Sequence, residues 1–195
     1  ATVFLKAKQS RSCTVCGKTQ TRMTGNKAKP TIKASVSSLT LKTKQKTTAL
    51  KISGLARGDS IASWKSTNTS VVKVSGRSNG SCTVTAGNKK GKATIIVTLK
   101  SGLKKNIPVT VQTTTVKTIK ITGIPSKLTL KRGQSKALHP VLFPVTSGEK
   151  ITYHSGNTKI VTVNSKGQIK AKKKGTVIIT VKSGGKSVKC KVTVK

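Results

Sequence analysis

Short runs of alternating apolar and polar residues follow one another along most of the chain. Alternation with a period of two places apolar side chains on one face of a β-strand, and each run is followed by Gly, Ser, Asn or Lys, which are common at strand ends and turns. No segment has the period of an amphipathic helix. We therefore predict an all-β protein. The clearest runs are residues 39–42, 71–74, 94–99 and 107–111.

The order of these runs occurs twice, which indicates an internal repeat. Two pairs of matching segments are separated by the same 89 residues. A third pair has a smaller offset, so the first copy contains a longer turn around residues 76–91. The matched segments are 38–42 with 127–131, 64–74 with 153–163, and 92–102 with 176–184.

Each copy holds roughly seven short strands about eight to twelve residues apart, which is the pattern of a two-sheet sandwich. We predict two tandem immunoglobulin-like β-sandwich domains, at residues 31–113 and 114–195. Residues 1–30 precede them as a cysteine-containing leader or the end of another module. The joining segment 112–117 is rich in β-branched residues and lacks glycine, which predicts a stiff connection.

Seven motifs follow one another in the second copy, at residues 116–119, 128–133, 138–140, 153–163, 167–171, 174–181 and 188–194. With them the second copy resembles the bacterial immunoglobulin-like group 2 family. The first copy keeps Trp64 and segment 68–74 but fits less closely because of its longer turn. The resemblance implies an extracellular module, usually in tandem, of the kind found in adhesins and in stalks of Gram-positive cell-wall-attached proteins. The family brings no catalytic residues.

The charge of the chain is strongly unbalanced. Forty Lys and Arg residues face two acids, Asp59 and Glu149, so the formal net charge is +38 and stabilising salt bridges are almost excluded. Such a surface attracts polyanions, and the attraction weakens as salt rises. Because salt bridges are almost excluded, burial of apolar side chains must hold the fold together. The residues available for burial are mostly Val, Ile and Leu, with one Trp, one Tyr and two Phe.

The lysines, which number 35 of the 40 basic residues, often alternate with apolar residues. Alternation places them on the solvent faces and edges of strands. We interpret them first as a solvated surface and second as a diffuse basic binding surface. The residues named for that surface are Lys170, Lys172, Lys173, Lys174, Lys189 and Lys191.

Cys13 and Cys16 have the spacing of half a zinc site, and Gly17 suits the tight turn of such a knuckle. Zinc takes four ligands, whereas Cys82 and Cys190 lie in predicted strands of different copies, where they fit as small buried hydrophobes. The pair is therefore a candidate metal half site completed elsewhere, or a local disulfide. We predict no complete metal site and no cofactor.

Catalytic chemistry has little to draw on in this sequence. His139 and His154 are not accompanied by a nucleophile motif, and one carboxylate in each copy does not make a paired-acid site. We therefore predict that the chain is not an enzyme.

Trp64 and Tyr153 occupy matching places in the two copies, each just before an asparagine, Asn68 or Asn157. We predict that the rings fill the sandwich cores rather than form platforms for sugars. The asparagines suit Asx turns, in which the side-chain oxygen accepts a bond from the backbone two residues on.

Two functions from different classes fit these features. The first is a secreted or cell-surface module, a rigid spacer or adhesive stalk beside neighbouring domains of the same protein, whose basic surface contacts anionic cell-wall polymers or acidic host glycans. The second is a dedicated polyanion-binding protein for a heparin-like glycan or nucleic acid. Sequence-specific nucleic-acid binding is disfavoured, because few arginines and aromatics are present to read or stack on bases.

The sequence also bears on location. No apolar run reaches the roughly eighteen residues of a transmembrane helix, so we expect no membrane span in this chain. The chain begins at Ala1 without an initiator Met or a signal-peptide pattern, and we expect it to be either a mature piece or an excised fragment.

Overall fold

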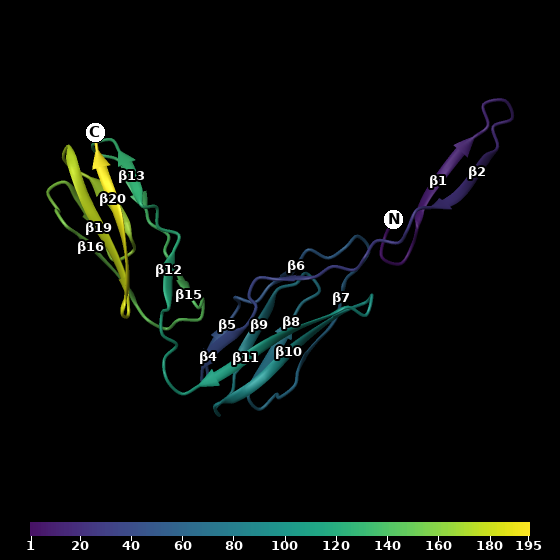
Figure 1. Cartoon of the computed structure of the whole chain (residues 1–195), viewed down its shortest axis with the longest axis horizontal. Helices are drawn as coiled ribbons and strands as arrows, with labels where there is room; N and C mark the ends of the chain where they lie inside the picture. The colour runs from purple at the N-terminus through teal and green to yellow at the C-terminus, as the bar shows by residue number, and fades with distance from the viewer. The chain divides into compact units, whose positions relative to one another are not determined.

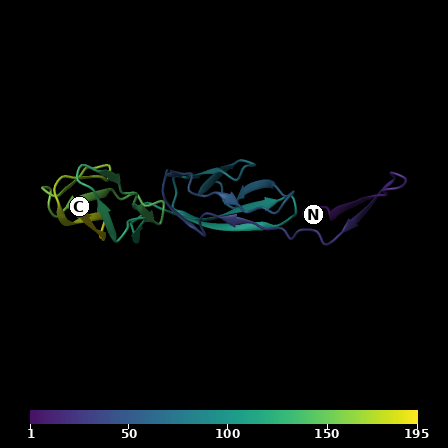
Figure 2. The same ribbon diagram turned by 90° about the horizontal axis from the view of Figure 1, so that it is seen from above.

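The computed structural model describes all 195 residues, and its regular elements are all β-strands (Figures 1 and 2). The chain divides into two compact units, Ala1–Thr113 and Thr114–Lys195, called unit 1 and unit 2 below. In each unit two sheets pack face to face over an aliphatic core. The prediction of an all-β chain with immunoglobulin-like sandwiches is confirmed.

In unit 1 the larger sheet has the order β4-β11-β10-β7, the smaller sheet has the order β5-β9-β8, and a short pair is formed by β3 and β6. The strands are β3 (Lys33–Ala34), β4 (Leu39–Lys42), β5 (Lys46–Thr47), β6 (Ile52–Ser53), β7 (Ile61–Ser66), β8 (Val72–Gly76), β9 (Cys82–Ala86), β10 (Gly91–Leu99) and β11 (Lys104–Gln112).

Unit 2 repeats this plan strand for strand, with sheets β13-β20-β19-β16 and β14-β18-β17 and the pair β12-β15. Seven strands of each unit thus lie in the two packed sheets, and the short pair brings each sandwich to nine; unit 1 also contains the β1–β2 hairpin. The strands are β12 (Lys120–Thr122), β13 (Lys127–Leu130), β14 (Ser135–Ala137), β15 (Val141–Phe143), β16 (Ile151–Ser155), β17 (Val161–Val163), β18 (Gln168–Ala171), β19 (Gly175–Ser183) and β20 (Lys186–Val194).

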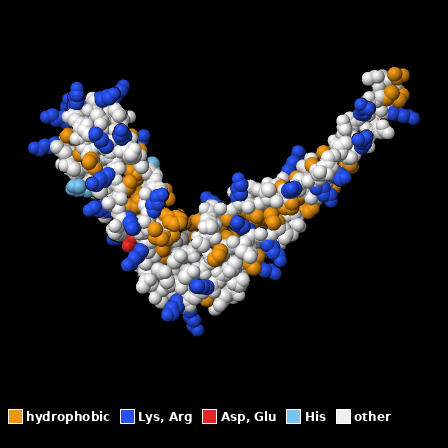
Figure 3. All heavy atoms as spheres, viewed as in Figure 1, with side chains coloured by type: hydrophobic (Ala, Val, Ile, Leu, Met, Phe, Trp, Pro, Cys, Tyr) orange, Lys and Arg blue, Asp and Glu red, His pale blue; other side chains and the backbone are white.

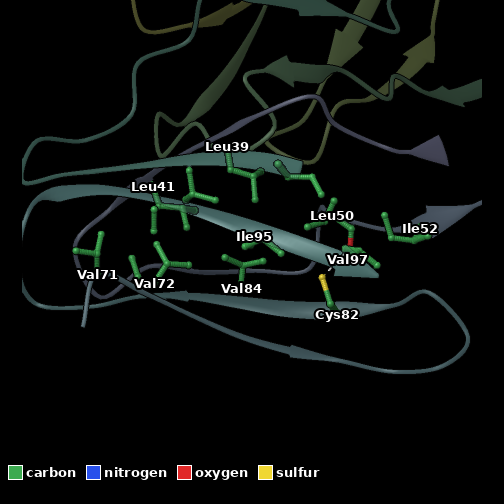
Figure 4. Close-up of a cluster of buried hydrophobic side chains, with 14 of the residues drawn as sticks. Leu39, Leu41, Leu50, Ile52, Val71, Val72, Cys82, Val84, Ile95 and Val97 are labelled. Carbon is green, nitrogen blue, oxygen red and sulfur yellow. Dashed lines mark hydrogen bonds between the residues drawn. The ribbon is translucent and has the colours of Figure 1, made fainter. Parts of the chain in front are cut away.

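The cores follow from the alternation in the sequence. Along β10 every second side chain from Ala93 to Leu99 is buried, and β19 behaves in the same way. Figure 4 shows the result in unit 1, where Ile95 of the larger sheet lies in one cluster with Val72 and Val84 of the smaller sheet. Burying one such aliphatic side chain contributes roughly 1.5–3 kcal/mol. Both phenylalanines, Phe4 and Phe143, are instead exposed.

In the larger sheet of each unit, the strand that comes first in the sequence pairs in parallel with the strand that comes last. β4 pairs with β11, and β13 pairs with β20, whereas the other neighbours in these sheets are antiparallel. Because parallel neighbours run in the same direction, the chain enters each unit at one end of the sandwich and leaves it at the other.

Residues 1–30 form a hairpin and its attachment to unit 1. β1 (Ala7–Ser12) pairs with β2 (Thr19–Thr24), and nearly all side chains of both strands are exposed. Before the hairpin, Val3 is buried and its N–H donates to the carbonyl of Arg57 at 3.1 Å. The hairpin therefore has almost no core of its own.

Candidate functional site

The lysines predicted to form a basic surface lie in three places. Lys189 and Lys191 project from the outer face of the larger sheet of unit 2, whereas Lys170 projects from the outer face of the smaller sheet. Residues 172–174, all lysine, lie in the turn between β18 and β19 and are exposed. Because the two sheets pack through their inner faces, these lysines are divided between opposite sides of the sandwich and do not form one patch.

Two further lysines accompany Lys189 and Lys191. Lys127 on β13 is the direct cross-strand partner of Lys191, and Lys182 lies on β19. All four are exposed, and we call them the lysine face. Lys127 and Lys182 were not among the predicted residues, although each alternates with inward-facing residues of its strand.

The lysine face runs diagonally across three strands. In the β19–β20 register Lys189 faces Thr180 and Lys182 faces Ser187, so Lys182 and Lys189 are diagonal neighbours. Diagonal neighbours lie roughly 7–8 Å apart, direct cross-strand neighbours roughly 5 Å and alternate residues of one strand roughly 6.7 Å. The order Lys127, Lys191, Lys189, Lys182 is therefore a continuous line of about 20 Å.

The only two carboxylates occupy corresponding places, immediately before β7 and β16. The Ser101 hydroxyl donates to Asp59 Oδ2 at 2.6 Å, and the N–H groups of Ser101 and Ser60 donate to Oδ1 at 3.2 and 2.9 Å. In unit 2 the N–H of Thr118 donates to Glu149 Oε2 at 2.6 Å. Both carboxylates are thus held by neutral donors, and the lysine charge stays largely uncompensated (Figure 3).

These hydrogen bonds set the pKa values of the two acids. The backbone bond from Thr118, its side chain and the nearby Lys117 lower the pKa of Glu149 against a smaller effect of desolvation. For Asp59 desolvation is the largest single effect and raises the pKa, but the bonds from Ser101 and Ser60 together outweigh it and leave the pKa lowered. Both groups are therefore charged at neutral pH.

A cluster of hydroxyl groups surrounds the start of unit 2. The Thr118 hydroxyl lies 2.8 Å from that of Ser147 and 2.8 Å from that of Ser183, and Ser147 Oγ donates to the carbonyl of Val116 at 3.2 Å. Thr118 and Ser183 are buried. Since these groups satisfy one another, the cluster fastens the first residues of unit 2 to its sandwich.

The aromatic rings pack against the cores as predicted, but they do not fill them. Trp64 and Tyr153 are half-buried against the cores of their units, and Gly76 and Gly167 lie directly against the two rings. Trp64 Nε1 is buried without a hydrogen-bond partner. Open hollows of about 440 and 460 Å³ flank Trp64, with Lys65 and Arg77 among their linings. The ring closes the space between the edge strands β7 and β8.

The asparagines before the next strands make the predicted turns. Asn68 Oδ1 accepts from the N–H of Ser70 at 3.1 Å, and Asn157 Oδ1 accepts from the N–H of Lys159 at 2.9 Å. These bonds fix the corners that follow β7 and β16. The asparagines are thus structural in both units.

Cys13 and Cys16 are exposed at the tip of the β1–β2 hairpin. The N–H of Gly17 donates to the carbonyl of Cys13 at 3.0 Å, and the N–H of Cys16 donates to Cys13 Sγ at 3.4 Å. The backbone bond from Cys16 is the main reason that the pKa of Cys13 is lowered. The turn therefore presents a thiol pair in which one sulfur is stabilised as thiolate, and its use as a metal half site stays a prediction.

The other two cysteines behave differently. Cys82 is buried in unit 1, where its thiol donates to the carbonyl of Leu50 at 3.2 Å, and Cys190 is buried in unit 2. Burial raises the pKa of Cys82 to about 11 and also raises the pKa of Cys190. Both are core residues, as predicted.

The remaining candidate groups are scattered. His139 and His154 are both exposed, the first after β14 and the second on β16. No group of three or more His, Cys, Asp or Glu side chains is placed to hold a metal ion. The structure also has no helix that is long and apolar enough to cross a membrane.

Comparison with known proteins places these features in a family context. Residues 115–192 match the bacterial Ig-like domain, group 2. A kappa-carrageenase of Pseudoalteromonas carrageenovora is 43% identical over 70 residues, which cover 35% of this chain and 18% of the carrageenase. The likeness is thus confined to a small part of that enzyme.

Solved structures that are similar to parts of this chain include a surface-layer protein and an enzyme. Domains 4 and 5 of the S-layer protein SbsC are 25% identical, with a TM-score of 0.38, over 68% of this chain and 75% of that one. A GH10 xylanase from termite gut that contains a bacterial Ig-like domain is 26% identical, with a TM-score of 0.30, over 35% of this chain and 18% of that one. The match to this family thus covers nearly the whole of unit 2.

Proposed function

We propose that the two units act as a non-catalytic extracellular spacer or adhesive stalk, whose basic surface contacts anionic cell-wall polymers or acidic host glycans. The observation that carries the spacer role is the parallel pairing of β4 with β11 and of β13 with β20. This pairing separates the entry and exit points of each unit. A nine-residue strand such as β11 spans roughly 30 Å, so each unit lengthens the chain instead of returning it to its start.

The short connection between the units supports stiffness. The carbonyl of Gln112 accepts a bond from Thr43 of unit 1 at 2.8 Å, and the carbonyl of Val116 accepts one from Gly148 of unit 2 at 3.0 Å. Residues 113–115, all threonine, separate these two anchors. Threonine is β-branched and therefore has less conformational freedom than glycine or serine.

The charge supports contact with anionic polymers. A net charge of +38, with both carboxylates held by serine and threonine groups, produces a positive potential around the units. The partial likeness to a kappa-carrageenase also supports the proposed contact with polysaccharides, because a similar segment occurs in that enzyme.

The spacer role is tested by measuring how widely the distance between the units varies. Spin labels are placed at Lys65→Cys and His154→Cys, which occupy corresponding exposed positions, in a chain that also carries Cys13→Ser and Cys16→Ser. Pulsed electron–electron double resonance should give a narrow distribution of distances between the two labels. The control carries a Gly-Gly-Ser-Gly insertion between residues 114 and 115 and should give a broad one. Equally broad distributions in the two proteins would exclude a rigid spacer.

The contact role is tested by titrating salt during binding to heparin and to a neutral glycan. Heparin should bind at low salt and weaken steadily as salt rises, because exposed charges are screened beyond about 10 Å at 0.1 M ionic strength. The neutral glycan should not bind. Binding of the neutral glycan that resists salt, or no binding of heparin even at low salt, would contradict the proposal.

A further inference from the structure

We propose that the lysine face of unit 2 is a binding track for a linear acidic polysaccharide, which lies diagonally across β13, β20 and β19. This inference rests on the proposed contact with anionic polymers and assigns that contact to four residues. They are Lys127, Lys182, Lys189 and Lys191, exposed on one side of one sheet.

The geometry fits an extended chain rather than a compact anion. The four lysine positions follow one another along a path of about 20 Å. A compact anion would meet one or two of them, whereas a polymer with repeated charges would meet all four. Lysine suits this task because its ammonium group is a point charge on a flexible stem that adapts to differently spaced anionic groups.

The uncharged groups around the lysines, mostly threonine hydroxyls together with the exposed Ile178 opposite Lys191, favour a polysaccharide. Thr129, Thr176, Thr180 and Thr193 lie on the same outer face, and the hydroxyls of Thr176 and Thr193 are 3.3 Å apart. Hydroxyl groups both donate and accept, as the hydroxyls of sugars require. On this face β13, β16, β19 and β20 carry no arginine, phenylalanine, tyrosine or tryptophan, and the only ring is that of His154 on β16, so base reading and stacking on several rings lack their usual groups.

Repulsion between the neighbouring lysines destabilises the folded sheet, which indicates that these residues serve binding and not stability. Lys127 and Lys191 are directly opposite each other, and like charges in this relation destabilise a sheet. Both carboxylates of the chain are held by serine and threonine groups, as described above. A bound polyanion would remove this repulsion, and the sheet would gain stability when it binds.

Unit 1 shows that the fold does not need lysine at these positions. The corresponding residues of its larger sheet are uncharged. The correspondence follows from aligning the long strands through the Trp64–Val97 and Tyr153–Val181 pairs. The lysines of unit 1 on this face, Lys42, Lys65, Lys92 and Lys104, occupy other positions. The uncharged counterparts of Lys127, Lys182, Lys189 and Lys191 are Ser38, Thr98, Asn106 and Pro108.

The test compares two variants of the full chain that lose the same number of charges. The face variant carries Lys127→Ser, Lys182→Thr, Lys189→Asn and Lys191→Thr. The control variant carries Lys170→Thr, Lys172→Thr, Lys173→Thr and Lys174→Thr, which lie on the smaller sheet and in the β18–β19 turn. Each is titrated with heparin at constant salt, and protection of Cys190 from alkylation verifies that unit 2 is folded.

The face variant should bind heparin at least about tenfold more weakly than the unmodified chain, and the control variant less than about threefold more weakly. Placing Ser38→Lys, Thr98→Lys, Asn106→Lys and Pro108→Lys in the face variant should recover part of the affinity through unit 1. Single-stranded DNA should respond much less than heparin to loss of the face.

The outcomes separate this inference from the function on which it rests. If both variants lose affinity equally, the contact is diffuse charge and the lysine face is wrong, while the proposed contact with polyanions stands. If DNA binding falls as much as heparin binding, the assignment to polysaccharide is wrong. If the unmodified chain fails to bind heparin at low salt, both the inference and the contact role fail.

Discussion

Units 1 and 2 share their inner faces and differ in their outer ones. Ile95 of β10 and Ile179 of β19 are both fully buried at corresponding places. On the outer side of the neighbouring strand, Asn106 of unit 1 corresponds to Lys189 of unit 2. Because alternate residues of a strand point to opposite faces, the two sets can vary independently. The fold therefore constrains the inner set, and the outer set is available for binding.

The corners before β7 and β16 also share one feature, a carboxylate, and differ in the residues that surround it. In unit 1 the hydroxyl and N–H of Ser101 and the N–H of Ser60 hold Asp59. In unit 2 the backbone of Thr118 holds Glu149, and the Thr118 hydroxyl also joins Ser147 and Ser183. One carboxylate per unit is thus retained for the same local task by different neighbours. The next experiments ask how far the two units are equivalent and independent.

The largest expected effect is in cysteine reactivity, which separates the cores from the hairpin. Iodoacetamide should modify Cys13 and Cys16 at least about 10³ times faster than Cys82 and Cys190, because the buried thiols react only when a unit opens. Cys13 should react first, since its pKa is lowered. Peptide mapping by mass spectrometry over time measures all four rates. Fast modification of Cys82 or Cys190 in the folded chain would mean that the corresponding core is not closed.

Truncating one core at a time should give the next largest effect. Ile95→Ala in unit 1 and Ile179→Ala in unit 2 should each lower the free energy of unfolding of the altered unit by about 2–5 kcal/mol, through lost burial and the cavity left behind. Urea titration combined with alkylation reads the units separately, because Cys82 reports unit 1 and Cys190 reports unit 2. Equal exposure of both thiols by either substitution would show that the units unfold together.

The glycines beneath the aromatic rings sharpen the comparison further. A methyl group added at Gly76 would overlap the ring of Trp64, and one added at Gly167 would lie 2.7 Å from the Tyr153 hydroxyl at a φ of +77°. Gly76→Ala and Gly167→Ala should each destabilise their unit by about 1–3 kcal/mol.

Smaller side chains opposite these glycines provide the control. Trp64→Leu should relieve most of the additional cost of Gly76→Ala. Tyr153→Leu should relieve less of the cost of Gly167→Ala, because the positive φ of Gly167 remains strained for alanine. Urea unfolding of the single and double variants measures these differences. No relief in unit 1 would show that ring overlap is not the cause.

Much of the fold could be predicted from the alternation of residues. The buried sets of β10 and β19, the repeat and the core positions of Trp64 and Tyr153 all follow from local patterns that the sandwich preserves. Phe143 could not be placed in this way. Its side chain is exposed because β15 pairs only with β12 in a separate two-stranded sheet, and composition carries no information on that pairing.

The lysine face was only partly predictable for a related reason. Alternation identifies Lys189 and Lys191 as outward residues of one strand, but cross-strand register decides which lysines become their neighbours. Lys127 is separated from Lys191 by most of unit 2 in sequence and is its direct partner in the sheet. Lys170 has the same local pattern and lies on the opposite side of the sandwich.

The smallest expected effect is on the pH dependence of stability, and it depends on the two acids. Their pKa values are lower in the folded chain than in the unfolded one, as described above for Glu149 and Asp59. The folded state therefore holds these carboxylates charged where the unfolded state has begun to protonate them. They stabilise their units above the ordinary carboxyl pKa of roughly 4, and this stabilisation is lost as pH falls through the folded values.

The lysines do not contribute to this dependence, because they remain protonated throughout the acidic range. The midpoint of thermal unfolding should fall by about a few degrees between pH 5 and pH 3. Glu149→Gln should remove most of this slope from unit 2, as read by Cys190, and Asp59→Asn should remove it from unit 1, as read by Cys82. A slope unchanged by the substitution in its own unit would show that the hydrogen-bonded carboxylate is not its source.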